Sequence, residues 1–390
     1  MRSVFLAFLK LGLTSFGGPI AHMVYFHREF VERRKWLDES QYAQLLAVSQ
    51  FLPGPASSQV GFSIGLIRAG WLGGLAAFCA FTLPSALLMV AFAGALPHLD
   101  APFGQALLHG FKLVAVAVVA HGVVTMAQRL TPDWQRGVIG VAAAAVIIAS
   151  GSAAMQLAVV IGGALLGLVL CRHVASVTNA GFELRYGVRS GVALLSIFAL
   201  LLVAALLTPR AAPEPLQAAA GFYRAGALVF GGAHVVLPLL EETVVEPGLM
   251  THEEFLAGYG AAQAVPGPMF SVAAFLGARL DAGAPAVGAT ICLLAIFLPG
   301  LLLAAGVLPL WRWITSHKAA ASALAGTNAA VVGLLAAAFY DPVWTTAVTS
   351  VSDGIIALVG FALLLFRRTS VLLVLLWCVA AALLQLIVDS

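Results

Sequence analysis

Long uncharged stretches separated by short polar loops are the main pattern along this chain. A run long enough to cross about 30 Å of hydrocarbon predicts one spanning helix, and such runs cover residues 71–96, 113–128 with a little before them, 190–208, 285–310, 319–339 and 371–388. Residues 137–171 also lack charge, but as one helix they would be about 52 Å long. Because Ser150, Gly151 and Ser152 lie near the middle of this run, we expect two short helices joined by a tight turn.

Four other apolar segments are interrupted near their centres by Gly and Pro. The segments are residues 5–32, 41–68, 216–240 and 255–279. The first and third contain Phe-Gly-Gly, and the second and fourth contain Pro-Gly-Pro three residues after a Gln; these blocks lie at 16–18, 230–232, 53–55 and 266–268. We therefore predict four broken helices, in two matched pairs.

The matched blocks indicate an internal duplication. A shift of 214 residues superposes the two Phe-Gly-Gly blocks and places Lys10 on Arg224, and a shift of 213 superposes the two Pro-Gly-Pro blocks. The matches occur in the same order in both halves, as expected of a repeat. We predict a first half at residues 1–189, a linker helix and loop at 190–214, and a second half at 215–390.

Charges in equivalent loops predict that the two halves are inverted. Loop 27–36 contains three Arg and one Lys, whereas its counterpart 241–254 contains five Glu and no Lys or Arg. Because basic loops stay on the cytoplasmic side, equivalent loops should lie on opposite sides of the membrane. Inversion requires that the chain cross the membrane an odd number of times between the start of one half and the start of the other. This requirement is met most simply if each broken segment enters and leaves the membrane on one side. The alternative has a first helix that crosses and a linker that stays at the interface.

The composition agrees with lipid as the solvent. Hydrophobic residues make up 61% of the 390 residues and charged residues only 9%, against about 25% charged in soluble domains. The predicted fold is therefore an all-α polytopic membrane protein with an inverted internal repeat, about nine spanning helices and four broken or re-entrant helical hairpins. A net charge of +3, without a basic stripe, gives no reason to expect nucleic acid as a partner.

Side chains outside these blocks give weaker signals. The four cysteines are far apart, so we interpret them as small buried hydrophobes. The histidines are scattered, so we predict no metal site and no cofactor. The N-terminal segment lacks a small-residue cleavage site after a clean apolar core, and we interpret it as mature protein. Asp353 is either a proton-coupling acid or the start of a short helix, and the second interpretation is favoured.

Breaks of this kind are suited to binding an oxyanion. The second arm of a broken helix presents free N–H groups and the positive end of the helix dipole. Candidate backbone contacts are Gly17, Gly18, Gly54, Gly231, Gly232 and Gly267. Candidate side-chain contacts are Gln50, Ser57, Ser58, Gln263 and Ser271, together with the cations Lys10, Lys112 and Arg224. The alternatives are that Gly and Pro only allow kinks and close packing, that Lys10 reaches the interface and that Lys112 marks the headgroup level. Arg68 and Arg279, which end two arms, fit interfacial anchors better.

The chain resembles the long-chain, two-domain form of the chromate ion transporter family. The resemblance rests on the paired Phe-Gly-Gly and Pro-Gly-Pro blocks, on a Lys or Arg six residues before each Phe-Gly-Gly, and on the duplicated layout. It implies a multi-pass inner-membrane transporter that exports chromate, a tetrahedral dianion shaped like sulfate. Ala233 stands where the first half has Pro19, which departs from strict symmetry.

The residues and the resemblance together predict an alternating-access oxyanion transporter in the lipid bilayer. They do not decide whether it forms a homodimer. No Gly-x4-Gly-Lys-Ser/Thr sequence is present to bind ATP phosphates. A dianion leaving a negative interior gains about 4.6 kcal/mol per 100 mV, so membrane potential or an ion gradient is sufficient to drive export. The alternative is a sulfate or related oxyanion importer coupled to a cation or proton. An intramembrane enzyme and an ungated pore are the remaining classes, and the enzyme is disfavoured because no catalytic constellation is visible.

Overall fold

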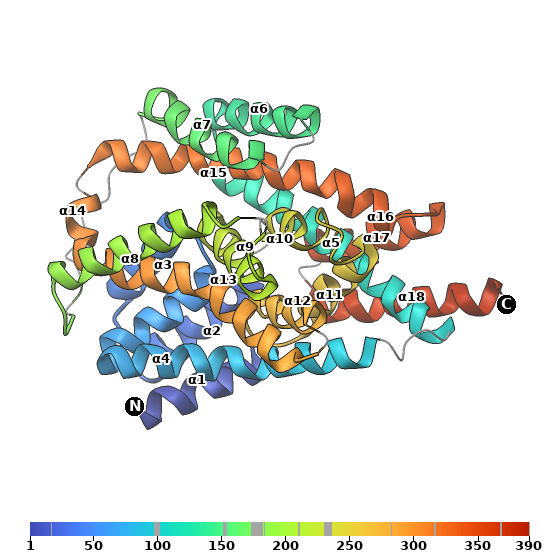
Figure 1. The fold of residues 1–390 in the computed structure, drawn as a ribbon, viewed down its shortest axis with the longest axis horizontal. Coiled ribbons are helices and arrows are strands. Elements are labelled where there is room, and N and C mark those ends of the chain that lie inside the picture. The colour runs from blue at the N-terminus through green and yellow to red at the C-terminus, as the bar shows by residue number, and fades with distance from the viewer. Residues whose placement is uncertain are drawn as a thin grey trace.

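The computed structural model describes residues 1–16, 18–96, 102–150, 154–172, 182, 184–209, 211–229, 236–281, 283–315, 317–366 and 369–389. Within these ranges the regular structure is entirely helical (Figure 1). The first half contains α1 (Arg2–Thr14), α2 (Gly18–Phe26), a π-helix (His27–Arg33), α3 (Glu39–Phe51), α4 (Ala56–Ala95), α5 (Pro102–Leu130), α6 (Trp134–Ser150) and α7 (Ala154–Leu170).

A linker helix, α8 (Val188–Leu206), leads to the second half. This half contains α9 (Glu214–Leu228), α10 (Val236–Val244), α11 (His252–Ala264), a 3-10 turn (Met269–Ser271), α12 (Val272–Leu280), α13 (Pro285–Val307), a 3-10 turn (Leu308–Leu310), α14 (Trp311–Thr315), α15 (Lys318–Ala338), a π-helix (Phe339–Trp344), α16 (Thr345–Ala347), α17 (Val351–Phe366) and α18 (Val371–Asp389). The two short helices predicted at 137–171 are confirmed as α6 and α7.

The breaks occur at the predicted blocks. The Pro-Gly-Pro at 53–55 separates α3 from α4, and the Pro-Gly-Pro at 266–268 separates α11 from the turn that leads into α12. The first Phe-Gly-Gly block lies between α1 and α2, and the second lies between α9 and α10, outside the described residues. Non-helical backbone at Ala69 and Gly70 also divides α4 into an arm of residues 56–68 and a longer helix of residues 71–95.

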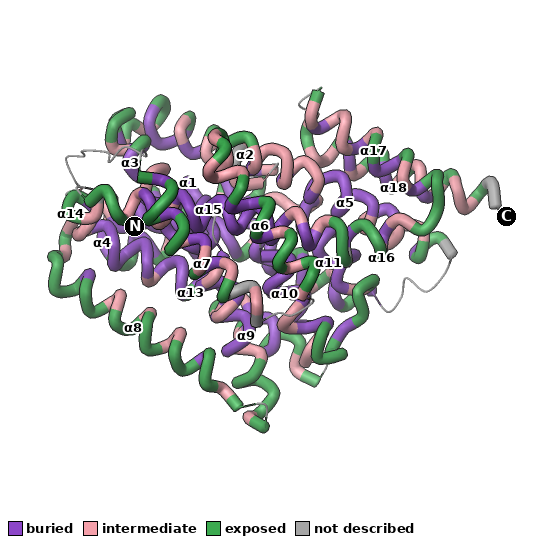
Figure 2. Tube along the Cα trace, turned by 90° about the horizontal axis from the view of Figure 1, so that it is seen from above, coloured by how far each residue is buried: buried purple, intermediate pink, exposed green. Residues whose placement is uncertain are grey.

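Among the described residues, five helices are long and apolar enough to cross a membrane, and five shorter apolar helices accompany them. The five long ones cover Ala56–Ala95, Phe103–Leu130, Val188–Leu206, Pro285–Ile314 and Lys318–Ala347. Buried residues fill the middle of the molecule, whereas α8 lies at the edge with most of its apolar side chains exposed (Figure 2). A chain that exposes so many large apolar side chains fits a lipid surrounding. Cys79 is exposed on α4, contrary to our expectation, while the other three cysteines are buried.

The two halves interlock through their later helices. In the first half α5 packs against α17 and α18 of the second half, and α15 packs in the equivalent way against α6 and α7 (Figure 1). Glycines allow both of these close helix contacts. A side chain at Gly110 would meet the backbone of Val379, and a side chain at Gly326 would meet the backbone of Gly163 and Gly167. Gly110 and Gly326 are equivalent under a shift of 216 residues, so the same close contact is built twice.

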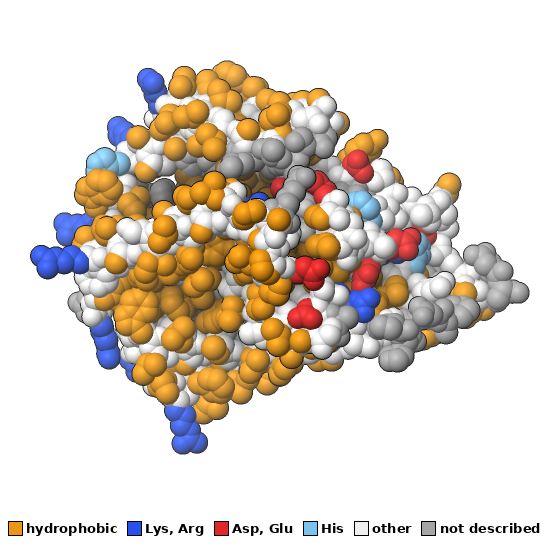
Figure 3. All heavy atoms as spheres, viewed as in Figure 1, with side chains coloured by type: hydrophobic (Ala, Val, Ile, Leu, Met, Phe, Trp, Pro, Cys, Tyr) orange, Lys and Arg blue, Asp and Glu red, His pale blue; other side chains and the backbone are white. Residues whose placement is uncertain are grey.

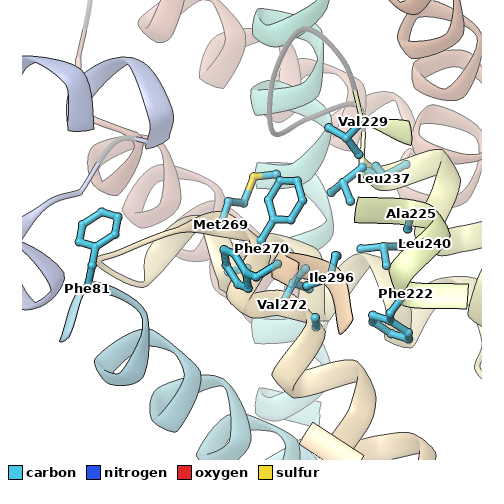
Figure 4. Close-up of a cluster of buried hydrophobic side chains, with 14 of the residues drawn as sticks. Phe81, Phe222, Ala225, Val229, Leu237, Leu240, Met269, Phe270, Val272 and Ile296 are labelled. Carbon is cyan, nitrogen blue, oxygen red and sulfur yellow. The ribbon is translucent and has the colours of Figure 1, made fainter. Parts of the chain in front are cut away.

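Apolar side chains hold the broken segments together. Phe222 on α9 and Leu237 and Leu240 on α10 lie toward Phe270 and Ile296 in one buried cluster (Figure 4). In the first half Phe8 stacks on Phe30 with ring centroids 4.8 Å apart and also contacts Phe26 and Phe81. Burying such large rings supplies most of the favourable packing around the breaks.

Candidate functional site

All four breaks meet through two hydrogen bonds that cross between the halves. The N–H of Gly54 donates to the carbonyl of Val229 at 2.6 Å, and the N–H of Gly267 donates to the carbonyl of Ser15 at 3.0 Å. Gly54 and Gly267 are equivalent, and so are Ser15 and Val229, each of which directly precedes a Phe-Gly-Gly block. Each Pro-Gly-Pro block is therefore bonded to the Phe-Gly-Gly break of the other half. We call this region the crossing.

Glycine is required at the centre of each Pro-Gly-Pro block. Gly54 has φ of +121° and Gly267 has φ of +106°, values that side-chain-bearing residues rarely adopt. A Cβ on Gly54 would also lie 3.0 Å from the Cα of Gly300, and a Cβ on Gly267 would lie 2.9 Å from the Oγ of Ser85. Ser85 and Gly300 are again equivalent positions. Both backbone conformation and close packing therefore exclude a side chain.

Gln59 and His22 fix the backbone around the crossing, and the sequence analysis missed both. The Gln59 Nε2 donates to the carbonyls of Pro53 and Gly300 at 2.7 and 3.2 Å. The His22 Nε2 lies 3.2 Å from the Ser15 carbonyl, which also accepts from Gly267. The sequence could have indicated Gln59, because a glutamine within the apolar run after Pro-Gly-Pro needs a hydrogen-bond partner. His22 has no counterpart at the equivalent position, Val236, and gave no such signal.

Unsatisfied buried polar atoms gather on the segments that form the crossing. A buried donor or acceptor without a partner costs about 1 to 3 kcal/mol, so each one needs an explanation. Within the described part of the chain, six such atoms belong to these segments: Ser15 Oγ, His22 Nδ1, Ser58 Oγ, Gln59 Oε1, Thr82 Oγ1 and Ser271 Oγ. A polar ligand bound at the crossing could form hydrogen bonds with these atoms and so remove this cost.

Ser58 and Ser271 are the matched pair among these atoms. They are equivalent under the 213-residue shift, and their exposed fractions are 2% and 1%. Ser58 lies in the first turn of α4, and Ser271 is the N-cap residue of α12, so both hydroxyls lie at the positive end of a helix. Ser57, beside Ser58, is also buried.

The other residues predicted to contact the oxyanion do not share one arrangement. Gly18 is the first residue of α2, has φ of +74° and has open space where a Cβ would be. The Gln263 Nε2 donates to the Sδ of Met269 at 2.7 Å. Gly17, Gly231 and Gly232 lie outside the described residues, as does the side chain of Gln50.

The three predicted cations are not gathered in one place. Lys10 is exposed on α1. Arg224 is half-buried on α9. The Lys112 Nζ lies 3.5 Å from a carboxylate oxygen of Glu253, so its charge already has a partner. Asn328, the counterpart of Lys112, is buried, and its Oδ1 lacks a partner among the described residues.

Asp353 begins a helix, as the favoured interpretation predicts. It lies in the first turn of α17, and its carboxylate accepts from the N–H groups of Thr349 and Ser350 at 3.1 and 3.0 Å. The His109 Nε2 lies 2.8 Å from the other oxygen. Among the described residues no group of three or more His, Cys, Asp or Glu is arranged to hold a metal ion.

Outside the membrane-spanning segments, equivalent positions form His–Glu contacts with the residue types exchanged. His27 lies 2.9 Å from Glu39, whereas Glu241 lies 2.8 Å from His252, and both residues of each pair are equivalent to those of the other. The hydrogen bond that the His27 ring donates to the Glu39 carboxylate raises the pKa of His27. Burial raises the pKa of Glu241 to about 8, and the nearby carboxylates of Asp341 and Glu246 add to this effect.

The two ends of the molecule also differ in charge. Most Lys and Arg side chains on the face in Figure 3 lie along its left edge, whereas Asp and Glu lie at its centre and right. Arg279 donates to Glu254 at 2.5 Å. Arg68, at the end of the corresponding arm of the first half, lies over the ring of Trp36 at 5.4 Å and has no ion pair to a described carboxylate. Gln41 stands at the position equivalent to Glu254.

Comparisons with known proteins identify the same family that the sequence motifs resemble. The family model described as chromate transporter matches residues 2–168 and 216–385, one region in each predicted half. A chromate transport protein of Pseudomonas aeruginosa is 31% identical over 350 residues, which cover 88% of this chain and 81% of the relative. A probable chromate transport protein of Synechococcus elongatus is 31% identical over 85% of this chain and 81% of its own, and a chromate transport protein of Cupriavidus metallidurans is 26% identical over 95% and 89%. No solved structure matches.

Proposed function

This chain belongs to the chromate transporter family, and we propose that it exports chromate across the inner membrane through a single oxyanion site at the crossing. The chain is a multi-pass membrane transporter and not an enzyme. The direction of transport, the energy source and the residues of the site are the parts that we propose.

The observation that carries the proposed site is the matched pair Ser58 and Ser271. A buried hydroxyl with no partner, at the N-terminus of a helix, is suited to donate to an oxyanion. The N–H groups of Gly54 and Gly267 already donate to carbonyls, whereas the hydroxyls of Ser58 and Ser271 have no partner among the described residues. The other predicted contacts, Lys10, Lys112 and Arg224 included, remain part of the proposal as sources of positive charge.

Inverted halves would allow one site to open alternately to the two sides. The opposite charges of equivalent loops support inversion as the positive-inside rule requires, because loop 27–36 contains three Arg and one Lys, whereas loop 241–254 contains five Glu and no Lys or Arg. The arms α3 and α11 have 13 residues each and reach about 20 Å, which is enough to approach the midplane without crossing. Labelling single cysteines placed at Arg33 and Glu246, in a chain with Cys79 replaced by Ser, should mark opposite sides of the membrane.

Membrane potential suits this proposal as the driving force. A dianion that leaves a negative interior gains about 4.6 kcal/mol per 100 mV. Export therefore needs no coupling carboxylate. Asp353, the candidate proton-coupling acid, is already fully engaged in hydrogen bonds.

Flux measurements in proteoliposomes test the proposal. Radiolabelled chromate and sulfate are supplied on either side, and a potential is imposed with a potassium gradient and valinomycin. We expect saturable chromate flux that follows the potential and shows counterflow, which excludes a pore. Sulfate accumulation against the potential, with a requirement for a cation or proton gradient, would instead establish the importer alternative.

A further inference from the structure

A pocket of about 400 Å³ lies between the start of α1 and the kink of α4. Its lining includes Ser3 and Val4 from α1, Arg68 and Leu72 from either side of the kink, and Arg185 from the segment before α8. The kink opens this space, because the helical path is interrupted at Ala69 and Gly70. The pocket lies apart from the crossing, and the proposed transport does not use it.

The two arginines that line the pocket lack carboxylate partners. Neither Arg68 nor Arg185 forms an ion pair with a described Asp or Glu. The guanidinium of Arg68 lies 5.4 Å from the centre of the Trp36 ring, an arrangement that orients the group without neutralising it. By contrast, Arg279, near the end of the corresponding arm in the second half, forms an ion pair with Glu254. The pocket therefore presents two positive charges that an anion would satisfy.

The surroundings of the pocket are apolar and exposed. On α4, Trp71, Leu72 and Leu75 are exposed, with Leu72 at 65%, and on α1 Phe5 and Leu6 are exposed. The ring of Trp71 lies 4.9 Å from that of Tyr186, and paired aromatic rings of this kind are typical of the membrane–water boundary. A ligand that joins an anionic head to hydrocarbon chains would match both the charged pocket and this apolar surface.

We propose that the pocket binds the phosphate headgroup of an anionic phospholipid. The proposal uses the orientation argued above, in which the basic end faces the cytoplasm, since the cytoplasmic leaflet carries the anionic lipids. A free oxyanion shares the charge chemistry, but it would make no use of the exposed apolar side chains of α1 and α4. The two arginines bind the phosphate, and the acyl chains lie along these helices.

Native mass spectrometry of the purified full-length chain, titrated with phosphatidylglycerol and separately with phosphatidylcholine of the same chain lengths, tests the proposal. We expect preferential retention of phosphatidylglycerol, and about thirtyfold weaker binding in the Arg68→Gln/Arg185→Gln variant. The matched control is Arg129→Gln/Arg172→Gln, which removes two exposed helix-end arginines outside the pocket. Equal retention by the pocket variant and the wild type would overturn the proposal.

A competition measurement keeps the test decisive. Inorganic phosphate is titrated in parallel as a soluble competitor. Displacement of the lipid by phosphate at an equal concentration would identify a soluble-oxyanion site and overturn the lipid assignment. The chromate flux assay separates these outcomes from failure of the transport proposal, because the pocket variants keep every residue of the crossing.

Discussion

The two halves are alike at the crossing and different at the ends of the molecule. At the crossing, Gly54 and Gly267 have the same backbone conformation, donate to equivalent carbonyls and pack against equivalent residues. At the ends, the pair His27–Glu39 corresponds to Glu241–His252, in which the residue types are exchanged. Arg68 lacks an ion pair of the kind that Arg279 forms with Glu254.

This contrast separates two demands on the same duplicated sequence. A site approached from either side needs equivalent contacts from both halves, so the crossing keeps the residue types of the repeat. In the inverted topology that we propose, the ends lie in chemically different compartments, where the positive-inside rule requires different charges. Duplication would then supply the symmetry, and substitution at the ends would set the orientation.

The largest effect is expected from a side chain added at the crossing. Gly54→Val and Gly267→Val should each abolish chromate flux and lower the free energy of unfolding by roughly 2 to 6 kcal/mol, because positive φ and close contacts both oppose the side chain. The control is Gly94→Val, since Gly94 has open space and an ordinary backbone conformation. Normal flux in both crossing variants would show that these glycines are dispensable.

A second change converts one end into a copy of the other. His27→Glu places two carboxylates together and should cost about 0.5 to 1 kcal/mol of stability, a range suited to partly exposed pairs. The double variant His27→Glu/Glu39→His restores the pair in the arrangement of the second half, and we expect stability close to that of the wild type. Chemical unfolding of the wild type, His27→Glu, Glu39→His and the double variant in parallel measures the coupling. Additive losses would mean that the pair contributes nothing.

The smallest expected effect is a pH dependence from the same pairs. His27 has a raised pKa, so its contribution to stability is present below the ordinary pKa of histidine and is lost as pH rises through the raised value. Glu241 keeps its proton up to about pH 8 in the folded chain, against 4.5 when unfolded, so stability also falls as pH rises through this window.

Both effects have the same sign. The unfolding temperature should fall by a few degrees between pH 5.5 and pH 8.5, and less in the variant His27→Gln/Glu241→Gln. Lys318→Gln, at the exposed start of α15, serves as a control for charge removal. An unfolding temperature that rises with pH in the wild type would contradict this assignment.

The sequence predicted the elements well because their signals are local. The Pro-Gly-Pro blocks marked breaks that the structure places at the same residues, and the small residues near 150–152 marked the end of α6. Packing partners carry no such signal. The contact of α5 with α17 and α18 joins residues more than 200 positions apart, and the Gly54 N–H was expected to be free because no local feature showed that Val229 would accept from it.

The most direct test of a single oxyanion site at the crossing is calorimetric titration of purified protein with chromate. We predict one chromate per chain in the wild type. Ser58→Ala and Ser271→Ala should weaken binding by similar factors, roughly ten- to a hundredfold, since each hydroxyl would donate to a charged group. Ser322→Ala, which removes a buried hydroxyl that donates to the Cys171 carbonyl far from the crossing, should leave the affinity unchanged. Two sites per chain, or wild-type affinity in both crossing variants, would contradict the account.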